Sequence, residues 1–374
     1  MITRHKLIHG TAASVLATVG TPFILQACSS DSSAGSYDAT VRSTWHPAKA
    51  PAGDKTALRQ EMVRYATLAP SSHNTQCWKF RIEDDAITIL PDLARRTPAV
   101  DPDDHHLYVS LGCAAENLVQ AALANGLKGN VRFDPESGGG GAIRVALEST
   151  KAVASSLYLA IPGRQCTRAE FDGEPLSTEE LRLLESAGTG AGVRVMLLTE
   201  KVALESVLAY VVEGNTAQMN DPAFVEELKS WIRFGSSEAV KTRDGLYSAT
   251  SGNPSVPRWI GSPLFGMFFK PKAENDKYAK HLRSSAGVAV FVSEASDKAH
   301  WIEAGRCYER FALQAAALGI RNAMLNPPVE VSRLRPQFAT AMGIGSGRPD
   351  LVVRFGRGPL MPKSLRRDLR EVTA

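Results

Sequence analysis

The sequence predicts an α+β fold made of two related halves, each a mainly antiparallel sheet packed with helices. Alternating apolar residues, typical of strands, occur in both halves beside segments with helical periodicity. Both halves follow the order helix, strand, helical insert, strand, long helix, strand. Their long helices end alike, in AALANGL at 121–127 and QAAALGI at 314–320. We therefore expect an internal duplication that forms a pseudo-dimer within one chain.

The bulk composition is that of a soluble globular protein. The chain has 374 residues, of which 44% are hydrophobic, enough to form a sizeable core. Lys and Arg number 43 and Asp and Glu 39, a net charge of +4. Because no dense basic run with interleaved aromatic residues occurs in the sequence, we expect no nucleic-acid partner.

The N-terminus has the features of an export signal. A basic start at Arg4–Lys6 precedes a mostly apolar run, Leu7–Leu25, and then Cys28. This resembles a bacterial lipoprotein signal, which predicts a signal peptide at 1–27, lipidation of Cys28 and an exported, periplasmic or cell-surface protein anchored to the membrane. An ordinary signal peptide and a single membrane anchor are the alternatives. Residues 3–8 resemble the twin-arginine export motif, with His5 in place of the second arginine, so the export route stays open.

The pattern along the chain divides it into four parts. Residues 28–54, rich in Ser, Ala, Pro and Gly, are expected to form a flexible tether. The first half, 55–160, contains a predicted helix, a hairpin and a long helix from Asp101. The second half, 161–374, contains a helix with the capping-box pair Ser177 and Glu180. Within it, 235–271 is rich in Gly, Pro and aromatic residues, and we expect an irregular, lid-like segment.

Between the first helix and the hairpin lies an unusual polar turn, APSSHNTQ at 69–76. Pro70 ends the helix, and small donors and acceptors follow it. Taken alone, these residues indicate a capped turn at a helix end.

Together with three other segments the turn resembles the nitroreductase family of FMN-dependent oxidoreductases. The segments are GRQCTRAEFDGEPL at 163–176, WIEAGRCYERFALQAAALGI at 301–320 and RFGRGPLMPKSLRR at 354–367. The resemblance covers about residues 55–370 and is closest to the double-length, Acg-like branch, in which one chain carries two nitroreductase-like halves. It implies a nitroreductase-like fold, FMN as cofactor, and NAD(P)H-type reduction of nitroaromatics or quinones by hydride transfer through flavin N5.

The resemblance also implies which residues bind FMN, and it identifies no catalytic side chain. Contacts to the flavin ring and ribityl chain are expected from Pro70, Ser71, Ser72, Asn74 and Gln76. Contacts to the phosphate are expected from Arg164, Gln165, Cys166 and Arg168, and from Lys363, Ser364, Arg366 and Arg367. Asn326 lies in the loop expected near N5. Because one half carries the ring contacts and the other the phosphate contacts, we expect a single FMN site between the halves. A monomer would then be enough to form the complete site.

Other interpretations stay open. The chain could bind and sequester FMN beneath a lid, with small-molecule donors and acceptors playing little part, or it could be a flavin-free relative. NAD(P)H is scarce outside the cytoplasm, so the electron donor of an exported protein stays open. Residues 101–106 offer acidic and histidine side chains, but a charged first helical turn is expected there rather than a metal site. Cys77, Cys113, Cys166 and Cys307 have no metal-binding spacing; buried free thiols are expected and disulfides stay possible for an exported protein.

Overall fold

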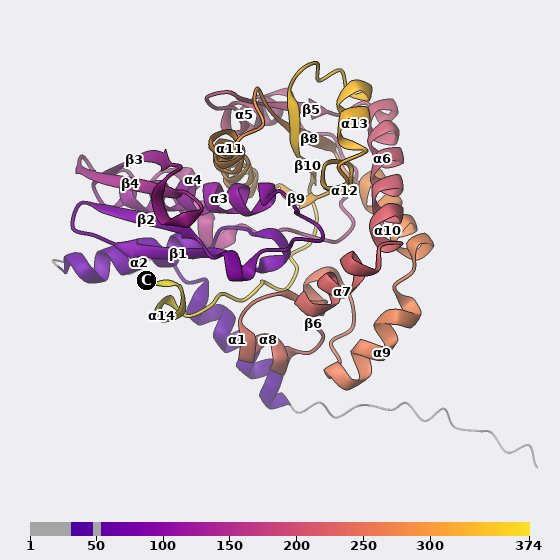
Figure 1. Ribbon diagram of the computed structural model, residues 1–374, viewed down its shortest axis with the longest axis horizontal. Coiled ribbons are helices and arrows are strands. Elements are labelled where there is room, and N and C mark those ends of the chain that lie inside the picture. Colours follow the sequence, from indigo (N-terminus) through magenta and orange to yellow (C-terminus); the bar gives the residue numbers. More distant parts are fainter. Residues whose placement is uncertain (1–30, 48–53) are drawn as a thin grey trace, which may run out of the picture.

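Two four-stranded antiparallel sheets form the centre of the molecule (Figure 1). The computed structural model describes residues 31–47 and 54–374. The first sheet has the order β1-β2-β4-β3, with β1 (Trp78–Ile82), β2 (Ala86–Pro91), β3 (Leu127–Asp134) and β4 (Ala142–Ser149). The second has the order β5-β8-β10-β9, with β5 (Val193–Leu198), β8 (Gly287–Ser293), β9 (Arg321–Met324) and β10 (Arg348–Gly356). If the strands of each half are numbered along the chain, both sheets have the same spatial order: first, second, fourth, third. The α+β prediction is confirmed, and the shared topology supports the predicted duplication.

The helices repeat in the same way. Helix α2 (Lys55–Thr67) precedes the first sheet and α5 (Thr178–Gly188) the second, whereas α3 (His105–Ala124) and α11 (Lys298–Ala317) each follow the second strand of their half. The Asp54 side chain caps α2 by accepting from two backbone N–H groups. The predicted capping box of Ser177 and Glu180 is present at α5 and is confirmed.

Helices α3 and α11 pack against each other through two equivalent glycines. Gly112 is the eighth residue of α3 and Gly305 the eighth of α11. A Cβ added to Gly112 would lie 2.0 Å from the carbonyl oxygen of Ile302, and one added to Gly305 would lie 2.0 Å from that of Val109. The contact is therefore reciprocal, as at a two-fold interface between identical subunits.

One hydrophobic core runs through both halves. Trp78 and Phe80 of β1 belong to the same buried cluster as Phe291 of β8, Phe311 of α11 and Phe355 of β10. A second cluster fills the other face of the second sheet. The halves are thus joined by a shared core, which is what an internal pseudo-dimer requires.

A large insert distinguishes the second half. Strands β1 and β2 are joined by a short turn, whereas residues 199–286 separate β5 from β8. This insert contains two short parallel strands, β6 (Ile232–Arg233) and β7 (Leu246–Tyr247). Its helices are α6 (Lys201–Met219), α7 (Pro222–Trp231), α8 (Ser236–Thr242), α9 (Arg258–Phe268) and α10 (Pro271–Arg283).

The expectation of an irregular segment at 235–271 is wrong in part, because α8 and α9 lie within it. Two of the prolines that suggested irregular structure stand at helix starts, and a third, Pro263, lies inside α9. Pro257 directly precedes α9 and Pro271 is the first residue of α10. At such positions proline interrupts no hydrogen bond of the helix.

The expected flexible tether is also corrected. Residues 31–44 of that segment form helix α1 (Asp31–Thr44). Tyr37 and Trp45 are buried against the body of the protein, and the Trp45 Nε1–H donates to the Ser364 carbonyl at 3.0 Å. These two aromatic side chains supply the packing that the Ser- and Ala-rich composition did not suggest.

Short helices and the C-terminal segment complete the fold. The helices are α4 (Ser156–Ala160), α12 (Pro327–Glu330), α13 (Arg335–Ala341) and α14 (Leu369–Val372). After β10 the chain crosses back to the first half, where the Ala374 N–H donates to the Phe80 carbonyl at 2.8 Å. The predicted second half therefore ends on the first sheet.

Candidate functional site

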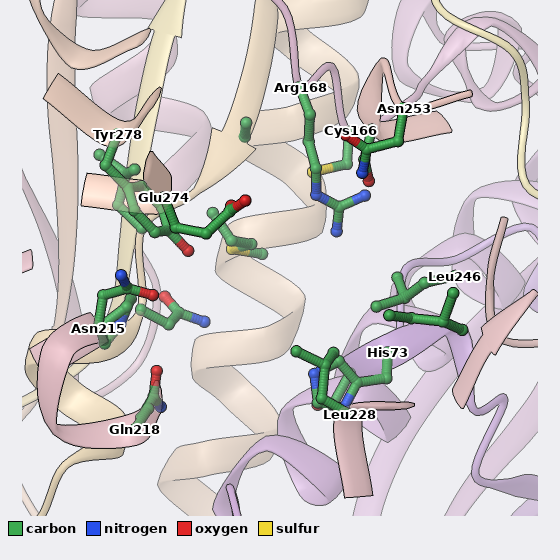
Figure 2. A pocket seen from close by; sticks show the side chains of 18 of the residues that line it. His73, Cys166, Arg168, Asn215, Gln218, Leu228, Leu246, Asn253, Glu274 and Tyr278 are labelled. Atoms are coloured by element: carbon green, nitrogen blue, oxygen red, sulfur yellow. The ribbon is translucent and has the colours of Figure 1, made fainter. Parts of the chain in front are cut away.

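A cavity of about 640 Å³ lies between the two halves and the insert (Figure 2). It is lined by the polar turn, α3 and the 166–168 segment, and by α6, α7, α9 and α10 of the insert. Residues 323–327 and β10 contribute the floor between them. Its volume is in the range of small-molecule sites, about 300–1,000 Å³.

The polar turn reaches the cavity in an unusual backbone conformation. Pro70, Ser71, Ser72 and His73 line the cavity. His73 has φ 46°, and the following Asn74 and Gln76 are left-handed too, with φ 53° and 52°. Such conformations are uncommon for non-glycine residues and persist where surrounding contacts impose them.

Two buried arginines hold the backbone at the end of α2, where the turn begins. The Arg366 guanidinium donates to the carbonyls of Thr67, Leu68 and Ala69, at 2.6, 3.1 and 3.0 Å. Arg164 donates to the Leu68 carbonyl at 2.7 Å. These carbonyls are the ones that a helix leaves without partners at its C-terminus. The arginines therefore fix the point from which the turn departs.

Asn74 and Gln76 brace the turn rather than line the cavity. The Asn74 side chain donates to the Gly245 carbonyl at 3.0 Å and accepts from Arg366 at 3.0 Å. The Gln76 side chain donates to the Arg243 carbonyl and accepts from the Arg367 N–H, at 2.9 and 2.8 Å. Both side chains tie the turn to segments that are distant in sequence.

Arg168 is a cation that lines the cavity, as are Lys277 and Arg354. Figure 2 shows its guanidinium pointing inward, and within residues 31–47 and 54–374 it has no hydrogen-bond or ion-pair partner. Arg354 holds the backbone on both sides of it, donating to the carbonyls of Thr167 and Ala169 at 3.0 and 2.7 Å. The sequence reasoning missed Arg354 because a strand arginine usually points to solvent; this one is 1% exposed.

The other predicted residues fall into two groups. Cys166 and Asn326 line the cavity, and the Asn326 side-chain oxygen accepts from the Val352 N–H at 3.0 Å. A second group makes contacts elsewhere, with backbone groups or aromatic rings: Gln165 with Met361, Lys363 with Trp45, Ser364 with Trp45, and Arg367 with Gln76. For both groups a contact to a cofactor stays a prediction.

Several of the predicted cations lie close together in the interior. Burial, reinforced by Arg164, Arg366 and Arg321, lowers the pKa of Lys363 to about 8. Burial and Arg164 likewise lower the pKa of Arg366 to about 9. Glu309 is the buried acid beside them, with an Oε1 3.2 Å from the Arg164 Nε, and burial raises its pKa to about 7. Glu309 alone does not balance the charges of Arg164, Lys363 and Arg366, and the remaining positive charge favours binding of an anion nearby.

The insert supplies a polar wall that the sequence reasoning did not identify. Asn215 and Gln218 of α6 and Glu274 and Tyr278 of α10 line the cavity opposite the turn (Figure 2). The Gln218 amide donates to Glu330 at 2.7 Å. The available signal was the length of the insert, which marks residues 199–286 as additional to the repeated unit.

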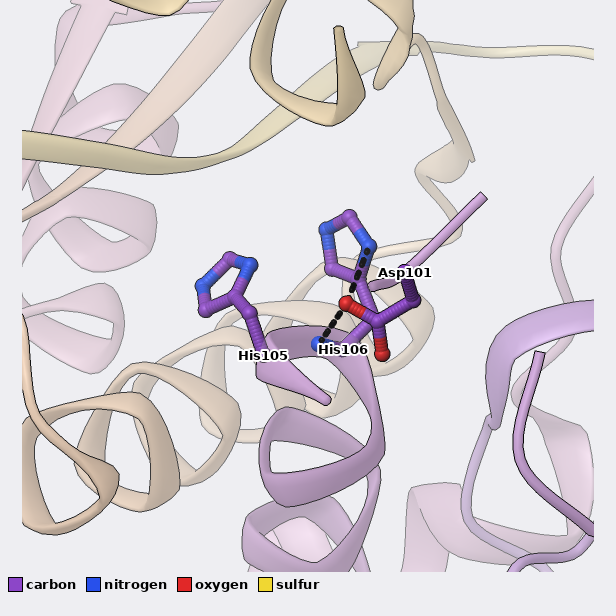
Figure 3. A group of neighbouring side chains, drawn as sticks. All are labelled: Asp101, His105 and His106. Carbon is purple, nitrogen blue, oxygen red and sulfur yellow. Dashed lines mark hydrogen bonds and ion pairs between the residues drawn. The ribbon is translucent and has the colours of Figure 1, made fainter. Parts of the chain in front are cut away.

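Asp101, His105 and His106 form a buried cluster at the start of α3 (Figure 3). The two Asp101 oxygens accept from the His106 and Leu107 N–H groups, both at 3.0 Å, so the carboxylate caps the helix. The His105 Nε2 lies 2.9 Å from Asp350 Oδ1. Burial raises the pKa of Asp101 to about 7 and lowers those of both histidines. The hydrogen bonds of Asp101 are those of a residue that caps the start of a helix.

The four cysteines in the described part of the chain are free thiols. Among the described helices, α3 alone is long and apolar enough to cross a membrane, and 78% of its most apolar stretch is buried inside the protein. The predicted signal peptide and the lipidation site Cys28 lie outside the described residues.

Comparison with known proteins places the chain beside two mycobacterial sequences. It is 25% identical over 326 residues to "Putative NAD(P)H nitroreductase Rv3131" of Mycobacterium tuberculosis, covering 83% of this chain and 89% of that protein. It is 24% identical over 329 residues to "Putative NAD(P)H nitroreductase acg" of the same species, covering 85% and 95%. The chain is thus homologous to these proteins over most of its length. No protein-family model matches it.

Two solved structures are similar to parts of the chain. A nitroreductase with bound FMN from Desulfitobacterium hafniense is 14% identical, with TM-score 0.39, covering 59% of this chain and 99% of that one. The FMN-dependent nitroreductase NfnB from Mycobacterium smegmatis, in complex with NADPH, is 15% identical, with TM-score 0.40, covering 59% and 97%.

Proposed function

We propose that this protein is an FMN-dependent oxidoreductase of the nitroreductase family, taking electrons from an NAD(P)H-type donor and passing them to nitroaromatic or quinone acceptors. The observation that carries the proposal is the cavity between the halves, into which both the polar turn and the unpartnered Arg168 project. The homology to proteins named as NAD(P)H nitroreductases supports the reaction class.

The residues of the cavity fit FMN. A phosphate monoester carries a charge of about −1.5 to −2 at neutral pH and binds well to a planar guanidinium. Arg168 offers an unpaired guanidinium, and Arg354 holds its backbone in place. Ser71 and Ser72 offer short polar groups that leave room for a flat ring above them.

When bound, FMN would supply hydride transfer at its ring. The protein would then hold and orient the group rather than take part covalently. Ser71 and Ser72 line the cavity, and the turn is held by Ser71 Oγ, which accepts from the Gln76 N–H at 2.9 Å. Phe265 and Phe269, stacked at 4.4 Å, help the insert to exclude water from the cavity.

A change at Arg168 tests the proposal. Arg168→Ala removes a charge-assisted contact worth about 1.5–3 kcal/mol, so we expect FMN affinity to fall by roughly 10- to 100-fold. Flavin absorbance per chain after dialysis and titration of the apoprotein measure the effect. Arg182→Ala, an exposed arginine paired with Glu179, is the matched control and should retain flavin. Equal retention in both variants would contradict the assignment.

Sequestration of FMN is the second candidate function. The insert that covers the cavity, α7 to α10, favours it, because a covered flavin would be shielded from donors. Anaerobic NADPH separates the two. Bleaching of the flavin followed by recovery with a nitroaromatic supports turnover, whereas flavin that stays oxidised supports sequestration.

We further propose that the protein is exported and anchored through lipid on Cys28, and that it works as a monomer. The basic start, the apolar run Leu7–Leu25 and the following cysteine support the anchor. The shared core of the two halves supports the monomer.

A further inference from the structure

Helix α9 exposes apolar side chains on its outer face. Trp259 is 77% and Met267 is 63% exposed, and Pro263 between them is exposed too. The three residues are spaced by four, so they form one stripe along the helix. A large aromatic side chain left in water beside other apolar groups marks an interaction surface.

The opposite face of α9 is part of the cavity wall. Gly261, Leu264 and Phe265 line the cavity. Gly261 is needed there, because a Cβ at that position would lie 2.4 Å from the Phe234 ring. One helix therefore separates the cavity from the surroundings, with apolar side chains on both of its faces.

The position of α9 in the molecule suggests what covers it. Helix α1 packs on the insert through Tyr37 and Tyr247, whose rings lie 4.8 Å apart. Glu238 of α8 pairs with Arg258 of α9 at 2.7 Å. Thus α1, α8 and α9 lie at one end of the molecule (Figure 1). Cys28 stands three residues before the start of α1, so a bilayer that held a lipid on Cys28 would be close to this end of the molecule.

The charges around α9 fit the same partner. Arg258 begins the helix, and Lys270 and Lys272 follow its end. Interfacial helices place aromatic and aliphatic side chains at the boundary of the acyl chains, with basic residues among the headgroups. The outer face of α9 and its flanks have this arrangement.

We propose that α9 docks on the surface of a lipid bilayer, with Trp259, Pro263 and Met267 in the interfacial layer, and thereby opens the cavity toward the lipid. The acceptor class is then an uncharged, lipid-soluble ring compound such as a long-chain quinone. This second part rests on the proposed reaction; the docking rests on the exposed stripe of α9 and on the proposed N-terminal anchor. The apolar residues beyond α9, Phe224, Leu228 and Leu246, provide a fitting path for such a ligand.

Tryptophan fluorescence tests the docking. The chain has 5 tryptophans, and Trp259 is the exposed one, since Trp45, Trp78 and Trp301 are buried and Trp231 is half-buried. We expect the full chain, reconstituted in phosphatidylcholine–phosphatidylglycerol vesicles with brominated acyl chains, to lose fluorescence relative to unbrominated vesicles. In Trp259→Phe this loss should vanish.

A relocated reporter provides the control. Leu159 on α4 is 67% exposed, and α4 lies far from α9 in Figure 1. In the double variant Trp259→Phe, Leu159→Trp we expect no bromine quenching. Equal quenching of wild type and Trp259→Phe would overturn the proposal. So would a wild-type Trp259 that is shielded from iodide without lipid, because another part of the chain would then cover it. A lipid-free dimer that Trp259→Ser, Met267→Ser dissociates would also overturn it.

The acceptor class has its own measurement. With vesicles present, Trp259→Ser, Met267→Ser should slow reduction of a long-chain quinone at least about tenfold, while a water-soluble quinone is reduced at the wild-type rate. Equal slowing of both would contradict entry from the lipid. If neither quinone is reduced by the wild type, the proposed function fails, and the quenching result still decides the docking.

Discussion

The reciprocal glycine contact between α3 and α11 gives a sharp test of the internal pseudo-dimer. Gly305→Ala would place a methyl group 2.0 Å from the Val109 carbonyl oxygen and 2.8 Å from its carbon. Carbon–oxygen contacts are normally no closer than about 3.3 Å, so the helices would have to separate locally by roughly 1.3 Å. Because Val109 lies in the shared core, that separation opens packing on both sides.

The expected cost follows from two opposing effects. Overpacking of a close contact typically costs about 1–3 kcal/mol, and helix propensity returns about 0.5–1 kcal/mol when alanine replaces glycine. The clash is backbone against methyl and cannot be relieved by a side-chain rotation. We therefore expect a net loss of about 1–2 kcal/mol in the free energy of unfolding.

Thermal unfolding followed by circular dichroism measures this loss. Gly112→Ala should lower the midpoint by a similar amount, because the contact at Ile302 has the same 2.0 Å geometry. Gly35→Ala is the control, since a Cβ there meets no atom within 4 Å and Gly35 also lies in a helix. The reasoning is refuted if Gly305→Ala unfolds at the wild-type temperature or above it.

Three further changes test other parts of the account. Burial and the nearby Arg168 lower the pKa of His73 from 6.5 to about 4. Between these pH values His73 is protonated in the unfolded chain but neutral in the folded chain, so the free energy of unfolding falls as the pH drops from 6.5 to 4. His73→Asn, which tolerates the left-handed backbone, should flatten unfolding free energy against pH in that window; an unchanged slope would argue against a neutral His73. Arg366→Met leaves carbonyls of α2 unpaired and should cost about 2–4 kcal/mol in urea unfolding, whereas the exposed Arg370→Met should cost little, and equal effects would contradict the capping role. In the Trp259→Ser, Met267→Ser background, which removes the proposed docking of α9, Cys28→Ser should leave the protein unacylated and release it from membranes in fractionation, and continued membrane association would count against the lipid anchor.

The fold was largely predictable in segments whose own spacing of apolar residues matches the period of a helix or a strand. The hairpin of β1 and β2 and both long helices show their periodicity in the sequence, and the structure contains them as predicted. Helix α1 was missed because its stability comes from Tyr37 and Trp45 packing on distant segments. Helix α9 was missed because glycine and proline suggest a loop, while its partners, such as Phe234, are distant in the fold.

The candidate site shows a different limit of prediction from sequence: the contacts of a charged side chain depend on distant parts of the chain. The family resemblance implied that Arg164 and Arg366 would contact a phosphate, but a cation can equally well donate to the carbonyls at a helix end. The structure pairs both with carbonyls at the end of α2. Of the predicted cations in the described part of the chain, Arg168, whose neighbours are held by Arg354, is the one that lines the cavity without a partner. Which cation remains unpaired depends on the tertiary structure and cannot be read from local spacing.

The central claim is that two unequal halves of one chain enclose a single FMN. Titration of the apoprotein with FMN, combined with light scattering to give the mass of the complex, tests it most directly. We predict one FMN bound per chain in a monomeric protein. Two FMN per chain, one FMN per pair of chains, or no binding at all would contradict the account.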